Sequence, residues 1–125
     1  GQAEARYELY CADEPEVLLV GYGIVSRVLR SAVDLARAQG IRAGLFRPVT
    51  LWPFPSQALA RTARRCQSVF VVEMSTGQMV EDVRLALDGR ADVEFFGRVG
   101  GNVPLAEEVC QELLVRMGMT VDWGV

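Results

Sequence analysis

The sequence predicts a three-layer α/β/α sandwich built on a parallel sheet. Short continuous apolar runs, typical of strands buried on both faces, alternate with stretches of helical periodicity. Parallel strands joined by helices need right-handed crossovers, which place helices on both faces of the sheet. The chain has 125 residues, of which 50% are apolar, so it can bury a core of its own. We expect one domain over residues 1–125, with its core over about 7–116.

Five strands are expected along the chain. The first alternates apolar and polar residues, which is typical of a sheet edge, and the other four are apolar runs. In chain order they cover residues 7–10, 17–20, 41–46, 68–72 and 93–96. The crossovers predict a sheet in which 41–46 lies beside 17–20, followed by 68–72 and then 93–96.

Four helices are expected between and after these strands. They cover residues 24–39, 55–66, 78–87 and 105–115. Gly40 directly follows the first helix and is expected to end it as a residue with positive φ. The last stretch, 117–125, has no periodicity, and we expect it to be partly disordered.

One stretch, residues 47–55, stands out because it holds three prolines and two large aromatic residues. Each proline fixes its own φ and biases the preceding residue toward extended geometry, so this stretch cannot lie inside a helix. We expect a stiff extended connection that begins directly after the strand ending at Phe46. Trp52 and Phe54 have two open interpretations: they cap the core, or they dock another protein surface.

Composition excludes many kinds of chemistry. The chain contains neither histidine nor lysine, and all 13 basic residues are arginine. Catalytic triads with histidine, histidine metal clusters, Schiff-base lysines and the phosphate-loop lysine are therefore impossible. The net charge of -3, without a basic stripe, gives no support for nucleic-acid binding, and no apolar run reaches membrane-spanning length.

Three cysteines, Cys11, Cys66 and Cys110, are widely spaced and odd in number. They suggest neither a disulfide framework nor a metal site. Cys66 and Cys110 lie in helical patterns, where we expect them to be buried as small hydrophobic residues. This cysteine usage fits a reducing cytoplasm.

A glycine turn, Gly21-Tyr22-Gly23, follows a strand and opens a helix, which is the setting of a dinucleotide fingerprint. Ser26 replaces the third glycine, and Arg47 stands where an acid would hold a ribose hydroxyl. An arginine there could meet a phosphate, so a nucleotide-binding module for NADP, CoA or ADP is the alternative function. The motif is weak, and a plain strand-to-helix turn is the favoured interpretation.

Two further loops follow strands at the same predicted edge. Glu73 ends one strand, and its carboxylate could act as a base, cap Gly77 or pair with Arg47. Because the chain has no histidine or lysine to partner a base, we favour a structural role. The loop 97–102 contains Arg98 and several glycines. Its amides could hold an anion, or it could be a flexible turn, and the sequence does not decide between them.

Five sequence segments resemble a known family when taken in this order. They are 21–23, 46–55, 72–74, 77–84 and 97–101. Together they resemble the C-terminal, transketolase C-terminal-like domain of the α subunit of 2-oxoacid:ferredoxin oxidoreductases, most closely the 2-oxoglutarate type. The similarity runs over residues 17–112. The resemblance implies a mostly parallel sheet whose N-terminal edge strand, 7–10, runs antiparallel to its neighbour.

The resemblance also implies a function for the complete enzyme. That family decarboxylates 2-oxoacids on thiamine diphosphate with Mg²⁺, passes electrons through iron–sulfur clusters to ferredoxin, and forms an acyl-CoA. Thiamine diphosphate lies between a preceding pyrimidine-binding domain of the same subunit and the β subunit. The thiamine and cluster motifs are absent from this chain. We therefore expect no catalytic, cofactor or metal residues here, and a role in inter-domain and subunit assembly.

The residues expected at that interface lie in the loops described above. They are Arg47, Trp52, Phe54, Glu73, Gln78 and Arg98. The chain starts at Gly1 rather than at methionine, and we expect it to be a piece of a longer protein. Alone, it is predicted neither to bind thiamine diphosphate nor to turn over 2-oxoglutarate.

Overall fold

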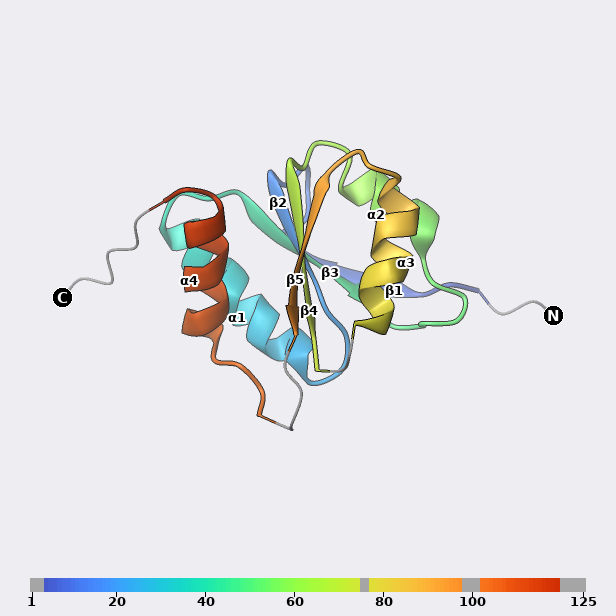
Figure 1. The fold of residues 1–125 in the computed structure, drawn as a ribbon, viewed down its shortest axis with the longest axis horizontal. Coiled ribbons are helices and arrows are strands. Elements are labelled where there is room, and N and C mark those ends of the chain that lie inside the picture. Colours follow the sequence, from blue (N-terminus) through green and yellow to red (C-terminus); the bar gives the residue numbers. More distant parts are fainter. Residues whose placement is uncertain (1–3, 75–76, 98–101, 120–125) are drawn as a thin grey trace.

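A five-stranded sheet in the order β1-β3-β2-β4-β5 forms the middle layer of the molecule (Figure 1). The computed structural model of the chain describes residues 4–74, 77–97 and 102–119. The strands are β1 (Tyr7–Tyr10), β2 (Val17–Val20), β3 (Ala43–Pro48), β4 (Ser68–Glu73) and β5 (Asp92–Gly97). The helices are α1 (Val25–Ala38), α2 (Ser56–Thr62), α3 (Gln78–Leu87) and α4 (Ala106–Arg116).

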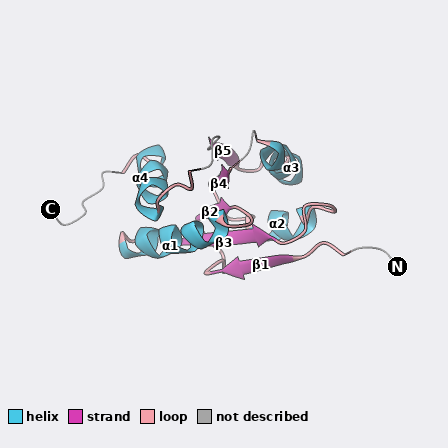
Figure 2. Cartoon of the chain, turned by 90° about the horizontal axis from the view of Figure 1, so that it is seen from below, coloured by secondary structure: helices cyan, strands magenta, loops and turns pink. Residues whose placement is uncertain are grey.

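The helices cover both faces of the sheet, with α1 and α4 packed together on one side and α2 and α3 on the other (Figure 2). β1 pairs antiparallel with β3, and the other three strand pairs are parallel. The predicted strand order, the antiparallel edge strand and the three-layer fold class are therefore confirmed.

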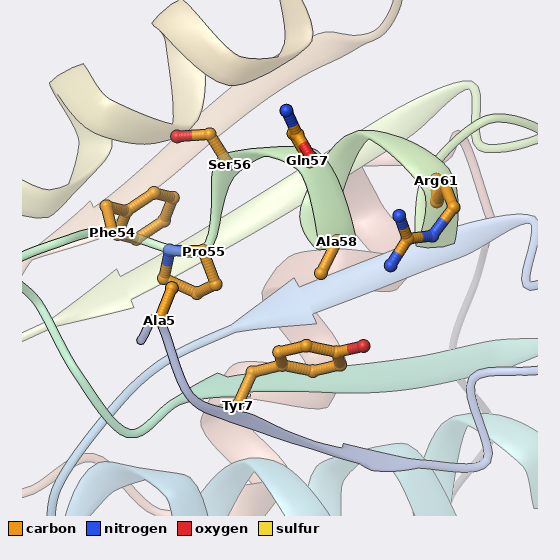
Figure 3. Close-up of a pocket in the computed structure, with 8 residues that line it drawn as sticks. All are labelled: Ala5, Tyr7, Phe54, Pro55, Ser56, Gln57, Ala58 and Arg61. Atoms are coloured by element: carbon orange, nitrogen blue, oxygen red, sulfur yellow. The ribbon is translucent and has the colours of Figure 1, made fainter. Parts of the chain in front are cut away.

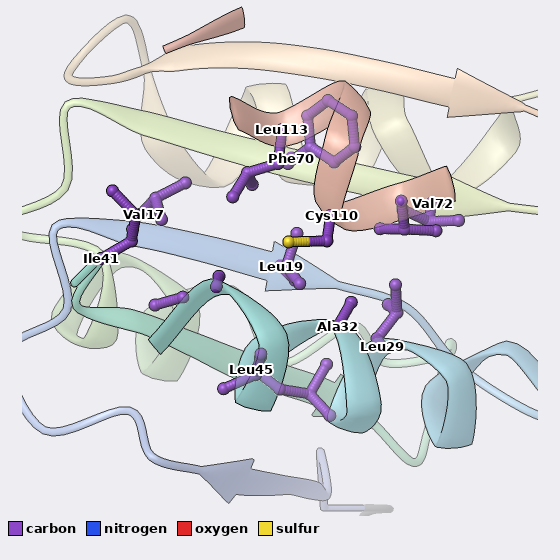
Figure 4. Packing of buried hydrophobic residues seen from close by; sticks show 14 of the residues in the cluster. Val17, Leu19, Leu29, Ala32, Ile41, Leu45, Phe70, Val72, Cys110 and Leu113 are labelled. Carbon is purple, nitrogen blue, oxygen red and sulfur yellow. The ribbon is translucent and has the colours of Figure 1, made fainter. Parts of the chain in front are cut away.

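β2 lies at the centre of two hydrophobic cores. Val17 and Leu19 face the core under α1 and α4 (Figure 4), whereas Leu18 and Val20 face the core under α2 and α3; all four are at most 1% exposed. Successive side chains of a strand point to opposite faces, so an uninterrupted apolar run supplies both cores at once. Burying each such side chain contributes about 1.5–3 kcal/mol to folding.

Most element boundaries lie within one residue of the expectation, but β3, which covers Ala43–Pro48 rather than 41–46, and α2 differ by more. The β3 strand extends to Pro48, beyond Phe46, because β1 pairs with it as far as Tyr7↔Pro48. The N–H of Val49 donates to the Arg6 carbonyl oxygen (2.8 Å), so the nitrogen of Pro48 points away from β1. On that side β2 pairs only as far as Phe46, so the missing N–H of proline costs no ladder bond.

The second difference concerns α2, which ends at Thr62 rather than at Cys66. The chain turns here because the N–H of Gln67 donates to the Glu16 carbonyl oxygen (3.2 Å), which aligns the start of β4 with β2. The Cys66 thiol is nevertheless buried and donates to the Pro15 carbonyl oxygen (3.1 Å). The expected end of α1 is confirmed, since Gly40 follows it with a φ of 85°.

At the end of the chain, α4 stops at Arg116, and residues 120–125 of the expected disordered tail lie outside the described residues. Within residues 4–74, 77–97 and 102–119, no helix combines the length and the apolar character needed to cross a bilayer.

The three cysteines differ in burial, which predicts their reactivity. Cys66 and Cys110 are buried as expected, and Cys11 is exposed. Burial raises the pKa of the Cys66 thiol to about 11, and burial followed by the charge of Glu107 raises the pKa of Cys110. At pH 8, roughly one Cys66 thiol in a thousand would be a thiolate, the reactive form.

Treatment of the folded chain with iodoacetamide at pH 8, followed by mass spectrometry, should show labelling of Cys11 alone. In denaturant, all three cysteines should be labelled. Labelling of Cys66 or Cys110 in the folded chain as fast as Cys11 would contradict this packing.

Candidate functional site

The loops that follow β2, β3 and β4 lie at one edge of the sheet, where α/β proteins commonly place functional groups. One of them, residues 49–54, is largely exposed, and we call it the aromatic loop. Its Trp52 side chain is 93% exposed, and Val49 and Leu51 beside it are also exposed. Trp52 is thus not part of the core, which removes one of its two open interpretations.

The root of the aromatic loop is held by the segment just before β1. The N–H groups of Val49 and Thr50 donate to the Arg6 carbonyl oxygen (2.8 and 3.2 Å), and the Arg6 N–H donates to Thr50 Oγ1 (2.8 Å). The Thr50 hydroxyl also donates to the Pro53 carbonyl oxygen across the loop (3.0 Å). The loop therefore carries Trp52 into solvent on a backbone that is already ordered.

Phe54 behaves differently from Trp52. It is half-buried and packs against the core under α2 and α3, while Pro55 is buried. Beside it lies an open cavity of about 430 Å³ between the N-terminal segment and α2, lined among others by Tyr7, Phe54 and Arg61 (Figure 3). The Tyr7 ring closes the sheet side of this cavity and stacks on Phe46 at 5.2 Å between ring centroids. Phe54 thus anchors the loop to the domain.

Glu73 is buried at the carboxyl end of β4, at 1% exposure. Its Oε1 accepts a hydrogen bond from the N–H of Met79 (2.8 Å), in the first turn of α3. Gly77, the residue before α3, has a φ of 97° and no side chain that could cap the helix. The carboxylate therefore reaches across the loop and takes the place of the missing cap.

One of the two structural roles left open for Glu73, pairing with Arg47, is wrong. Arg47 forms an ion pair with Glu8 on β1, because Arg47 and Glu8 are direct partners in the β1–β3 register. Gln78 is exposed in the first turn of α3. Arg98 and residues 98–101 of its loop lie outside the described residues.

Both glycines of the turn after β2 have local structural roles. A Cβ on Gly21 would lie 2.4 Å from Leu29 Cδ1 and 2.8 Å from Val25 Cγ1, so glycine there lets α1 pack on the strand end. Gly23 turns the chain with a φ of 65°. The Ser26 hydroxyl donates to the Gly23 carbonyl oxygen (2.7 Å), which closes the turn at the position of the third fingerprint glycine.

Three arginines gather between this turn and the edge strand, and only Arg47 among them was singled out from the sequence. Arg27, Arg30 and Arg47, together with Glu8, line two adjoining cavities that we call the arginine groove. Arg30 lies over the Tyr10 ring, 4.3 Å from its centroid, and the Tyr10 hydroxyl donates to Asp34 (2.6 Å). That hydrogen bond raises the pKa of Tyr10. A helical wheel places Arg27 and Arg30 on the solvent side, which is why the pattern alone did not single them out.

Among the described residues, no group of three or more cysteine, aspartate or glutamate side chains could hold a metal ion. The arrangement at this edge is a protruding aromatic loop beside a basic groove.

A family model described as pyruvate:ferredoxin oxidoreductase core domain II matches residues 15–109. The chain belongs to this family. The ketoisovalerate oxidoreductase subunit VorB of Methanothermobacter thermautotrophicus is 49% identical over 110 residues, which are 88% of this chain and 31% of that protein. The 2-oxoglutarate synthase subunit KorA of Methanothermobacter marburgensis is 33% identical over 102 residues, 82% of this chain and 27% of that protein. The domain spans about a third of these curated relatives.

Two solved structures share the fold of this core domain II. A 2-oxoglutarate:ferredoxin oxidoreductase from Magnetococcus marinus superposes with a TM-score of 0.75 at 22% identity, over 86% of this chain and 19% of that chain. A split-gene transketolase, described as an inactive beta4 tetramer, superposes with a TM-score of 0.76 at 19% identity, over 91% and 42%. At such identities the likeness shows the fold alone. The family and the transketolase C-terminal-like fold expected from the motifs are confirmed.

Removing the carboxylate of Glu73 from core domain II should destabilise it. Glu73→Ala leaves the buried Met79 N–H without this acceptor and opens a cavity, which together cost about 2–4 kcal/mol in free energy of unfolding. Glu73→Gln keeps an acceptor oxygen and should cost less. The control is Glu81→Ala on the exposed side of α3, where loss of the pair with Arg84 should stay within about 0.5 kcal/mol. Urea unfolding measures all three variants, and equal losses for Glu73→Ala and Glu81→Ala would contradict the capping role.

Proposed function

We propose that this domain is a non-catalytic assembly domain of the α-type subunit of a 2-oxoacid:ferredoxin oxidoreductase. The observation that carries the proposal is the exposed Trp52 on an ordered loop. The neighbours it would contact are the preceding pyrimidine-binding domain of the same subunit and the β subunit. Those other parts of the enzyme would hold thiamine diphosphate, Mg²⁺ and the iron–sulfur clusters. Ferredoxin and CoA would be partners of the whole complex, which we place in the cytoplasm.

Trp52 has the physical character of an interface anchor. An aromatic side chain buries about 200 Å², which at about 25 cal/mol per Å² favours association by roughly 5 kcal/mol before the costs of association. Ordering a flexible loop is one of those costs, and it is small here because the hydrogen bonds of Arg6 and Thr50 already hold the loop. Tryptophans of this kind dominate the binding energy of many interfaces.

The remaining candidate residues fit such a contact to different degrees. Gln78 is exposed and Arg47 is partly exposed, so both can reach a partner. Glu73 is buried and would act through the α3 loop that it supports. Phe54 would hold the aromatic loop in place while Trp52 makes the contact.

For the substrate, we propose a branched-chain 2-oxoacid rather than 2-oxoglutarate. The motifs were most similar to the 2-oxoglutarate type, but the ketoisovalerate subunits reach 47–49% identity and the 2-oxoglutarate synthase subunits 30–35%. Assaying the assembled enzyme with 2-ketoisovalerate and with 2-oxoglutarate tests this choice. A higher kcat/KM for 2-oxoglutarate would reverse it.

Replacing Trp52 distinguishes an effect on subunit association from an effect on the stability of this domain. Trp52→Ser should leave the melting temperature of the 125-residue chain unchanged, because the side chain lies in water. In the enzyme it should weaken association of this subunit with the β subunit by about 2 kcal/mol or more, or roughly thirtyfold. Co-purification and analytical ultracentrifugation measure the association, and differential scanning calorimetry the stability.

A matched control is Leu105→Ser, which removes another exposed apolar side chain at the start of α4, a helix on the face of the sheet away from α2. Serine is a good residue at that position, so the fold should be kept. Association should match the wild-type enzyme. If Trp52→Ser assembles normally, or if both variants weaken assembly equally, the docking role of the aromatic loop fails.

A further inference from the structure

We propose that the arginine groove is a binding site for a phosphate group carried by a small molecule. Its lining residues come from β1, from the start of α1 and from the end of β3, and the two cavities share Ser26, Arg27 and Arg47. Their volumes, about 230 and 430 Å³, exceed what a phosphate alone would fill. The ligand would therefore be a phosphate with an organic group attached, and a nucleotide has this size and chemistry.

The arginine groove carries more positive than negative side chains. The groove contains three guanidinium groups and one carboxylate, Glu8, on a chain whose net charge is -3. Several arginines outside the groove are matched with acids: Arg64 and Arg65 share Glu14, and Arg116 meets Glu94 and Glu112. The Arg27 guanidinium, by contrast, has no hydrogen-bond or ion-pair partner within the part of the chain that the structure describes. Three guanidinium groups thus face a single carboxylate, which neutralises the positive charge of the groove only in part.

Two of the three arginines of the groove are held in place by neighbouring side chains. Arg30 lies over the Tyr10 ring, and Arg47 is held by Glu8 through one nitrogen. The Nε of Arg47 is buried without a hydrogen-bond partner, although the rest of the side chain is partly exposed. Guanidinium groups fixed in this way lose little freedom on binding, and their planar forks match the oxygens of phosphate.

The backbone adds to this charge. Gly23 and Ile24 line the larger cavity at the start of α1, whose first turn contains no acidic residue and no side-chain cap. The partial positive charge of a helix N-terminus therefore acts in the same direction as the arginines. Because Gly21 and Ser26 are occupied in packing and in closing the turn, recognition would rest on the arginines rather than on a glycine-rich dinucleotide motif.

Titration of the 125-residue chain with inorganic phosphate and then with ADP, followed by ¹⁵N–¹H NMR, tests the proposal. We expect saturable shifts of the amides of Gly23, Ser26, Arg27 and Arg47, with a dissociation constant for ADP at or below about 1 mM. ADP should bind more tightly than phosphate, and equal binding of the two would contradict the inference that an organic group fills the rest of the groove. Binding should weaken with added salt.

Three variants are expected to change ligand binding in different ways. Arg27→Gln removes an unpaired charge without disturbing an internal contact and should weaken binding about tenfold. Glu8→Gln removes the competing negative charge but keeps an acceptor oxygen for Arg47, so it should tighten binding several-fold, which a general loss of structure would not do. The control is Arg64→Gln, an exposed arginine near the opposite edge of the sheet, which should bind as the wild type does.

The proposal is overturned if neither ligand shifts these amides at 10 mM, or if Arg27→Gln and Arg64→Gln lose binding equally. It is also overturned if assembly of the ligand-free enzyme protects Arg27 from modification by phenylglyoxal. In that case an acidic segment of a partner occupies the groove.

Discussion

The burial of β2 on both faces is the constraint on which the rest of the molecule depends. An apolar strand with no face toward water requires a covering layer on each side, so the chain must return over the sheet after every strand. α1 and α4 supply one layer, and α2 and α3 the other. Because β2, β3 and β4 are parallel, the loops that follow them meet at one edge. The aromatic loop and the arginine groove are neighbours for this reason.

The antiparallel edge strand β1 has a second role, because it holds both candidate surfaces in place. The backbone of Arg6, just before β1, binds the root of the aromatic loop, and Glu8 within the strand positions Arg47. Neither surface would be ordered in the same way without this strand. Glu73 has a similar positioning role inside the domain, since its carboxylate fixes the start of α3 beside the same edge.

The sequence predicted the strand order and the end of α1 at Gly40, since apolar runs and glycine act locally. The sequence did not predict the features that depend on contacts between residues far apart in the chain. β3 continues to Pro48 because β1 comes to lie beside it, and Arg47 pairs with Glu8, far away in the chain, rather than with Glu73. The gathering of Arg27 with Arg47 follows from packing α1 against the sheet, and no spacing in the sequence reveals it. The exposure of Trp52 depends on where its loop is anchored.

The central claim is that the aromatic loop docks another part of the enzyme. Its most direct test is the fluorescence of Trp52, measured in a Trp123→Phe chain in which Trp52 is the only tryptophan. Free in solution, the indole should emit as a water-exposed ring and be quenched by iodide. After addition of the α-subunit portion lacking this domain together with the β subunit, the emission should shift to shorter wavelength and the quenching should fall sharply. Unchanged emission and quenching in a complex shown to be assembled would contradict the account.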